Sequence, residues 1–107
     1  MRSEYLEHCI VATWLRARGI PFHHSPNETY TTSHAQKTMN KKKGVSPGFP
    51  DLMVFGKRLV FVELKREKGG RASPAQLEWQ RLLRERGFVC EICEGAQAAI
   101  SLLEQYV

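Results

Sequence analysis

Asp51, Glu63 and Lys65 are the residues of this chain whose types and spacing best suit metal-dependent hydrolysis. Asp51 precedes the apolar run 52–55, and a second apolar run, 59–62, leads into Glu63 and Lys65. Magnesium prefers oxygen ligands, commonly one or two carboxylates together with water. A bound ion of this kind stabilises a phosphoryl transition state and helps to generate hydroxide near neutral pH. Because a lysine beside the ion can orient the attacking water, the three residues predict a Mg²⁺ or Mn²⁺ site.

Two strands joined by a turn would position these groups. Both apolar runs have the branched and aromatic composition of strands, and Gly56-Lys57 between them favours a tight two-residue hairpin turn. Because side chains alternate along a strand, Glu63 and Lys65 share one face, and Asp51 begins the partner strand at the same end. The alternative is that Asp51 only caps a strand and that Glu63 and Lys65 form a weak, solvated ion pair. The rigid Gly48-Phe49-Pro50 segment before Asp51 and the expected burial of the second strand favour the metal site.

Three segments of the chain resemble one nuclease family. Gly48–Leu52, Val62–Lys65 and Ser73–Leu77 resemble, in order and spacing, the motifs of the VRR-NUC family (virus-type replication-repair nuclease) of the PD-(D/E)XK superfamily. The resemblance extends from Glu4 to about Val89. It implies an α/β fold with a restriction-endonuclease-like core, in which helices flank a mixed central β-sheet. It also implies a nuclease that acts on DNA, of the stand-alone type that resembles phage or bacterial repair enzymes.

A helix is expected between Ser3 and Arg18, because its apolar positions recur every three or four residues. In the resembled family, a glutamate of the first helix supplies a further metal ligand. Glu7 leans towards the inward face and is favoured for this role, acting directly or through water. Glu4, in the first turn, is interpreted as an acid that favours the helix dipole.

Gln76 belongs to a segment with the features of a helix start. Ser73 can cap the helix, Pro74 suits its first position, and Gln76 completes a capping box. These features explain Gln76 by structure alone. The resemblance implies another role, in which Gln76 reaches the active site and contacts a phosphate or a water on the metal. Both interpretations stay open.

The charge balance favours a polyanionic partner. The chain has 16 Lys and Arg residues against 11 Asp and Glu residues, a net charge of +5, and nucleic acid is the commonest partner of such proteins. Basic loops are expected to grip the DNA backbone without reading its sequence. The residues expected to do so are Lys41, Lys42 and Lys43, near the end of a short helix that Ser33 can cap, and Arg66, Lys68 and Arg71 after the second strand. The alternative for the three lysines is a solvated, mobile loop.

Polar residues near the first expected strand, 20–25, are weaker candidates. His23 and His24 are adjacent in that strand, so at most one of them can face a given site. We interpret them as an exposed polar pair rather than as ligands. Asn27 and Glu28, in the turn that follows, are candidates for a supporting role near the site.

The cysteines are expected to be structural. Cys90 and Cys93 lie three positions apart in the expected strand 88–93, which places them on opposite faces, and no partner ligands for zinc occur at matching spacing. Three cysteines, an odd number, argue against a disulfide framework and for a reducing compartment. No apolar run approaches the length of a membrane span. We therefore expect a cytoplasmic protein.

These features predict a single domain, residues 1–107, that is a Mg²⁺- or Mn²⁺-dependent DNA endonuclease. Asp51 and Glu63 would hold the ion, with the Leu64 carbonyl adding an oxygen. No base-reading helix stands out, so DNA shape rather than sequence is expected to select the substrate. A homodimer would suit a four-way (Holliday) junction, which needs two symmetric incisions. The alternatives are a flap or nicking enzyme, a restriction-like nuclease, or a non-catalytic DNA-binding module, which the complete set of Asp51, Glu63 and Lys65 disfavours.

Overall fold

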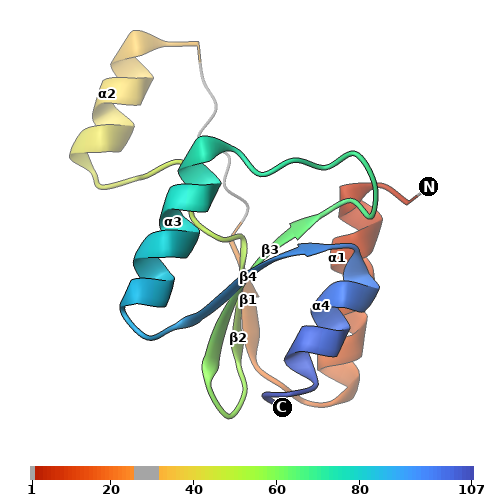
Figure 1. Cartoon of the computed structure of the whole chain (residues 1–107). Coiled ribbons are helices and arrows are strands. Elements are labelled where there is room, and N and C mark those ends of the chain that lie inside the picture. Colours follow the sequence, from red (N-terminus) through yellow and green to blue (C-terminus); the bar gives the residue numbers. More distant parts are fainter. Residues whose placement is uncertain (1, 26–31) are drawn as a thin grey trace.

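Helices and strands follow one another in the predicted order in the computed structural model, which describes residues 2–25 and 32–107. The elements in chain order are α1 (Glu4–Ala17), β1 (Phe22–His24), α2 (His34–Lys42), β2 (Leu52–Phe55), β3 (Leu59–Lys65), α3 (Pro74–Glu85), β4 (Val89–Glu94) and α4 (Ala96–Leu103) (Figure 1). The short helix α2 begins after Ser33, whose side chain accepts a hydrogen bond from the Gln36 N–H, as its capping role predicted.

The strands form one mixed sheet in the order β1-β2-β3-β4. β1 pairs antiparallel with β2, and β2 pairs antiparallel with β3, which confirms the expected hairpin. β4 joins the other edge of β3 in parallel. The parallel pair needs a crossover, and α3 supplies it. The predicted α/β fold with a mixed central β-sheet flanked by helices is therefore confirmed.

Helices cover both faces of the sheet. α1 and α4 lie on one face, where Val11, Leu15 and Leu103 pack with strand residues in the larger hydrophobic core. α3 lies on the other face, where Leu83 packs with Phe61 in a smaller core. Figure 1 shows these layers with the sheet between them. The strands in the middle are consequently apolar on both sides over most of their length.

Side-chain alternation divides β3 between the two faces. Val62 and Leu64 are fully buried in the larger core, whereas Glu63 and Lys65 point to the opposite face at the end of the strand. The same alternation explains the cysteines of β4. Cys93 belongs to the larger core and Cys90 to the smaller one, so the expectation of structural cysteines on opposite faces holds.

The turn between β2 and β3 is longer than predicted. It contains residues 56–58 rather than Gly56 and Lys57 alone, because β2 ends at Phe55 and β3 begins at Leu59. Arg58, which belongs to neither strand, donates a side-chain hydrogen bond to the Gly87 carbonyl at 2.7 Å. The turn is thus held from outside the hairpin.

Helix α2 stands apart from the rest of the fold (Figure 1). None of its residues is buried, and its last turn carries Lys41 and Lys42. Most helices in globular proteins are stabilised by packing of an apolar face, which α2 lacks. Over the described residues, no helix is both long and apolar enough to traverse a bilayer.

Candidate active site

One pocket of about 300 Å³ collects side chains from five parts of the fold. Its walls come from α1, β1, the segment before β2, the end of β3 and the start of α3. The residues that line it are Glu4, Tyr5, His8, His24, Asp51, Glu63, Lys65 and Gln76. The structure therefore brings together Asp51, Glu63, Lys65 and Gln76, all of which the sequence marked as site residues.

Asp51 is held in place by a backbone group of the neighbouring strand β3. Leu52 pairs with Val62, so Asp51 and Glu63 fall opposite each other at the open end of the hairpin. The Leu64 N–H donates to Asp51 Oδ1 at 3.3 Å, which orients the carboxylate across the strand end. The side chain of Asp51 is only 9% exposed. The buried carboxylate is thus pre-positioned at one wall of the pocket.

Glu63 and Lys65 form a close pair on the same face of β3. Lys65 Nζ lies 3.5 Å from Glu63 Oε2, and both side chains are buried. Burial, followed by the negative charge of Asp51, raises the pKa of Glu63 to about 8, against the opposing charge of Lys65. Two buried acids that repel each other are both stabilised in their charged forms by a further positive charge between them. A divalent cation between Asp51 and Glu63 would supply it.

Two histidines complete the pocket, and the sequence had marked neither as a site residue. His8 Nε2 lies 3.2 Å from Asp51 Oδ2, and the rings of His8 and His24 stack with centroids 4.2 Å apart. Burial alone would lower the pKa of His8, but the hydrogen bond and charge of Asp51 outweigh it and raise that pKa. Burial and the neighbouring His8 lower the pKa of His24. A signal for His8 was present, because it follows Glu4 by one helical turn.

The position of Gln76 shows the capping role and is compatible with the other role that the sequence left open. The Ser73 N–H donates to Gln76 Oε1 at 2.9 Å, and the Gln76 N–H donates to Ser73 Oγ at 3.1 Å, so the capping box is present. Gln76 also lines the pocket. Its location depends on a close approach of backbones: a Cβ on Gly48 would lie 2.7 Å from the backbone N of Gln76. Only glycine lets the segment before Asp51 pack so tightly on the start of α3.

Comparison with known proteins gives the family and the fold of the chain. The family model of the VRR-NUC domain matches residues 4–97. The chain belongs to the VRR-NUC family. A solved structure described as a VRR_NUC domain protein has the same fold, with a TM-score of 0.83, 24% sequence identity, and coverage of 100% of this chain and 89% of that chain. No curated protein matches the sequence. The family resemblance of the motifs is thereby confirmed, and with it the restriction-endonuclease-like core.

In this VRR-NUC domain, Glu4 and not Glu7 faces the pocket. Glu4 is exposed at its mouth, whereas Glu7 is fully buried on the side of α1 that packs against α4. Glu7 Oε1 accepts hydrogen bonds from the Ala96 N–H at 3.2 Å and from Arg2 Nε at 2.9 Å. The prediction that Glu7 reaches the site is therefore wrong. The rotation of α1 places Glu4, one turn earlier, at the pocket instead.

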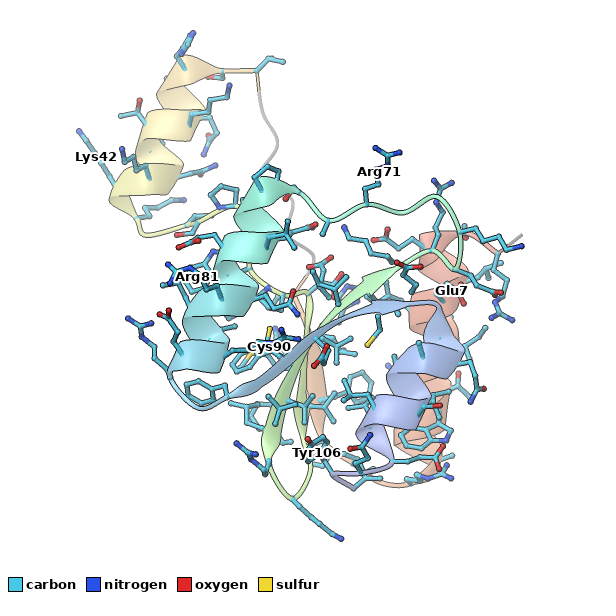
Figure 2. The ribbon with its side chains drawn as sticks, viewed as in Figure 1. Glu7, Lys42, Arg71, Arg81, Cys90 and Tyr106 are labelled. Atoms are coloured by element: carbon cyan, nitrogen blue, oxygen red, sulfur yellow. The ribbon has the colours of Figure 1, made fainter. Side chains whose placement is uncertain are left out.

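The basic residues of the VRR-NUC domain lie outside the pocket on exposed segments. Lys41, Lys42 and Lys43 are exposed at the end of α2, and Arg66, Lys68 and Arg71 are exposed in the loop between β3 and α3. Figure 2 shows Lys42 and Arg71 pointing away from the body of the protein. Among the described residues, these three lysines form no ion pair. Their charge is available to a partner.

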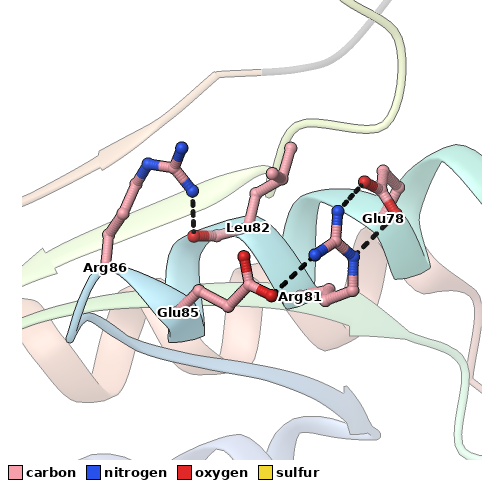
Figure 3. A network of polar contacts seen from close by, with 5 residues as sticks. All are labelled: Glu78, Arg81, Leu82, Glu85 and Arg86. Carbon is pink, nitrogen blue, oxygen red and sulfur yellow. Dashed lines mark hydrogen bonds and ion pairs between the residues drawn. The ribbon is translucent and has the colours of Figure 1, made fainter.

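Helix α3 presents a different surface, in which arginine is already paired. Arg81 forms ion pairs with Glu78 and Glu85 along one face of α3 (Figure 3). Arg84 pairs with Glu91 of β4 at 2.8 Å. These pairs neutralise most of the charge on this face. Of the weaker candidates, His23 is exposed outside the pocket lining, and Asn27 and Glu28 lie outside the described residues.

Proposed function

We propose that this VRR-NUC domain is a divalent-metal-dependent DNA endonuclease that hydrolyses phosphodiester bonds, with Mg²⁺ or Mn²⁺ as its ion. The observation that carries the proposal is the convergence of Asp51, Glu63 and Lys65 in one pocket. Buried ionisable groups are costly to assemble, and clusters of them in a pocket are concentrated at functional sites. Burial and then the negative charge of Asp51 raise the pKa of Glu63, and a divalent cation beside both acids would favour their charged forms again.

The ligands we propose for the ion are oxygen atoms. Asp51 and Glu63 would hold it, Glu4 would add a further carboxylate in place of Glu7, and the Leu64 carbonyl would contribute as the sequence predicted. All-oxygen ligand sets suit Mg²⁺ and Mn²⁺. When bound, such an ion stabilises the negative charge that develops on the phosphoryl oxygens. The exposed position of Glu4 at the pocket mouth supports its part in this set.

Lys65 and Gln76 are proposed to handle the reacting groups. In hydrolysis, a water oxygen forms a bond to phosphorus while the bond to the leaving sugar oxygen breaks. Lys65 would hold this water by a hydrogen bond, since its ammonium lies in the pocket beside Glu63. The oxygen of Gln76 is occupied by the Ser73 N–H, which leaves its NH₂ group to donate to a phosphate oxygen. This division of the two ends of one amide supports a role for Gln76 at the substrate.

The DNA backbone is proposed to lie across the pocket between two basic segments. One is the end of α2 with Lys41, Lys42 and Lys43, and the other is the loop with Arg66, Lys68 and Arg71. Charge complementarity with a polyanion supports this placement. The arginines of α3 are not part of the proposal because their charge is paired.

The substrate is proposed to be branched DNA, cut by a homodimer at a four-way junction. Two symmetric incisions need two active sites, and a two-fold dimer of a small domain provides them. Lysine and arginine side chains on these exposed segments suit contacts with the phosphate backbone, which position the DNA without reading its bases, and this supports recognition of shape rather than base sequence. We also propose that the protein works in the cytoplasm, and its three free cysteines support a reducing environment.

Cleavage of labelled four-way junction, flap, single-stranded and duplex DNA, with and without Mg²⁺, tests the reaction. The parental protein is expected to cut only when Mg²⁺ or Mn²⁺ is present. Asp51→Asn keeps a hydrogen-bond acceptor for the Leu64 N–H but loses the charge, and Lys65→Ala loses the amine. Each is expected to slow cleavage by at least about 100-fold while DNA binding persists. Lys57→Ala, which removes an exposed lysine of the hairpin turn, serves as the control.

The same assay decides the chemistry and the substrate separately. Parental-rate cleavage by Lys65→Ala in Mg²⁺ would show that the catalytic assignment is wrong. Preferential cutting of the flap would replace the junction with a flap substrate and leave the chemistry intact. Analytical ultracentrifugation at micromolar concentration should reveal a dimer, and a strict monomer that still resolves junctions would contradict the homodimer.

A further inference from the structure

His8, His24 and Asp51 bring two imidazole rings and a carboxylate together inside the pocket. One potential ligand atom from each residue lies within 4.8 Å of the other two. The three residues come from α1, β1 and the segment before β2, so only the folded chain assembles them. The reaction proposed above uses carboxylate oxygens and an amine, and it gives the two imidazoles no part.

We propose that these three residues form a nitrogen-containing metal subsite that takes a borderline divalent ion: Zn²⁺, Ni²⁺ or Co²⁺. Imidazole nitrogen suits these ions, whereas Mg²⁺ prefers oxygen and keeps its water. Asp51 is common to both ligand sets, so the subsite adjoins the oxygen ligands Glu4 and Glu63. The pocket then has two neighbouring ion positions of different chemistry.

The distances permit this subsite after one movement. Bonds of about 2.1 Å place two ligand atoms of one ion no more than about 4.2 Å apart, and the three ligand atoms, all within 4.8 Å of one another, are already close to that limit. The rings are nearly parallel, at 9°, and an ion in the plane of one stacked ring lies outside the plane of the other. His24 must therefore swing out of the stack to share an ion with His8.

The surroundings identify His24 as the residue that moves. It sits in the three-residue edge strand β1 and is exposed. The side chains of His8 and Asp51 are only 12% and 9% exposed, and the 3.2 Å between their ligand atoms is already close to the separation of about 3.4 Å between two donors on a tetrahedral ion. Two ligands are thus held on a rigid wall, and the third can close on the ion from the pocket mouth.

A simpler explanation is that Asp51 pairs with His8 and that His24 only stacks on it. The two explanations differ in what the loss of His24 does to ion binding. The neighbouring His23 provides a matched control, because it belongs to the same strand but does not line the pocket. His34 of α2 is a second control for histidines that bind ions at the surface.

Cobalt titration of the chelator-treated, full chain without DNA tests the subsite. Co²⁺ reports nitrogen and oxygen ligands through its visible absorption, and a sulfur-to-cobalt band in the near ultraviolet would reveal cysteine binding. The parental protein, His23→Ala and His34→Ala are expected to bind one Co²⁺ at the subsite with the two imidazoles, with the same affinity and spectrum. His24→Ala and His8→Gln should bind it at least about tenfold more weakly. Circular dichroism checks that each variant is folded.

Excess Mg²⁺ added to the cobalt-loaded protein separates the two ion positions. The cobalt spectrum is expected to persist, because Mg²⁺ takes the oxygen ligands. Displacement of Co²⁺ by Mg²⁺ would show one shared position and overturn the separate subsite. Parental Co²⁺ affinity in both His24→Ala and His8→Gln, or an equal loss in His23→Ala, would overturn it as well. Since no cleavage is measured, failure of this test leaves the proposed nuclease reaction standing.

Discussion

The carboxylate of Glu7 accepts a hydrogen bond from the backbone N–H of Ala96, at 3.2 Å and 89 positions away in the chain. Ala96 is the first residue of α4, and the preceding Gly95 has no side chain with which to cap that helix. The carboxylate also lies where the helix dipole favours negative charge. Glu7 therefore caps α4 from α1, which is a structural role.

Removal of Glu7 should affect stability, and removal of Glu4 should affect metal binding. Glu7→Ala leaves the start of α4 uncapped in a buried position, so it is expected to cost about 2–3 kcal/mol of unfolding free energy. Glu4→Gln, at an exposed position, should cost less than about 0.5 kcal/mol but weaken Mg²⁺ binding at least about tenfold. Urea unfolding and Mg²⁺ titration measure both quantities. If Glu7→Ala instead weakened Mg²⁺ binding and Glu4→Gln instead reduced stability, Glu7 would be the metal ligand.

The raised pKa of Glu63 predicts how the metal-free protein responds to pH. The pKa is about 8 in the folded chain, against an ordinary value of 4.5 for a glutamate, so the folded state holds this proton more tightly than the unfolded state. Stability should therefore fall as pH rises from about 4.5 towards about 8, by up to about 1.4 kcal/mol per pH unit. Urea unfolding across this range, in a chelating buffer, measures the slope.

Glu63→Gln isolates the residue responsible for that slope. The neutral amide has no proton to lose, so the variant should be flatter with pH and more stable than the parental protein near pH 8. His8 contributes a smaller slope of the same sign, because its pKa is also raised and its stabilisation is lost as it deprotonates. Identical slopes for Glu63→Gln and the parental protein would contradict the assignment.

Gly48 is predicted to be required for the placement of α3. A Cβ at Gly48, where φ is +87°, would lie 2.5 Å from the backbone carbon of Ala75. Gly19 also has a positive φ, +66°, but nothing lies within 4 Å of its Cβ position. Gly19→Ala should therefore cost only backbone strain, about 1–2 kcal/mol, and leave cleavage unchanged. Gly48→Ala should cost more and also slow cleavage, because Gln76 moves with α3.

Thermal or urea unfolding, combined with the cleavage assay, compares these two glycine variants at matched fractions of folded protein. Equal losses of unfolding free energy in both variants would mean that α3 shifts away from the new Cβ at no additional cost. The coupling between the Gly48 segment and Gln76 would then be wrong.

The lysines at the end of α2 are predicted to control the salt dependence of DNA binding. Each phosphate contact contributes about 0.9 to the slope of log affinity against log salt. Replacing Lys41, Lys42 and Lys43 together by Ala should reduce this slope by about 2–3. Arg81→Ala should leave it unchanged, since Arg81 is paired with Glu78 and Glu85. Fluorescence anisotropy over a salt series gives both slopes, and an unchanged slope in the triple variant would exclude α2 from the interface.

Local rules were sufficient for the central hairpin and for the capping box. Alternation along β3 places Glu63 and Lys65 on one face and Leu64 on the other, whatever the rest of the fold does. The same rule separates Cys90 from Cys93. Ser73 and Gln76 lie three residues apart, so their reciprocal hydrogen bonds form within a single helical turn. In each case the interacting groups are close in sequence, or their relation follows from one strand's geometry.

The choice between Glu4 and Glu7 was decided by tertiary packing. Three residues of an α-helix turn through about 300°, so these two side chains point only about 60° apart. Apolar periodicity cannot resolve so small a rotation, and both glutamates were reasonable candidates. The buried face of α1 contains Glu7, Val11 and Leu15, which turns Glu7 towards Ala96 and leaves Glu4 at the pocket.

What the sequence by itself determined is the hairpin with Asp51, Glu63 and Lys65, because these residues lie on paired strands joined by a short turn. The tertiary structure alone decided that His8 and His24 join them. The second turn of α1 and an edge strand meet there only because α1 packs across the sheet, and no local rule relates their positions.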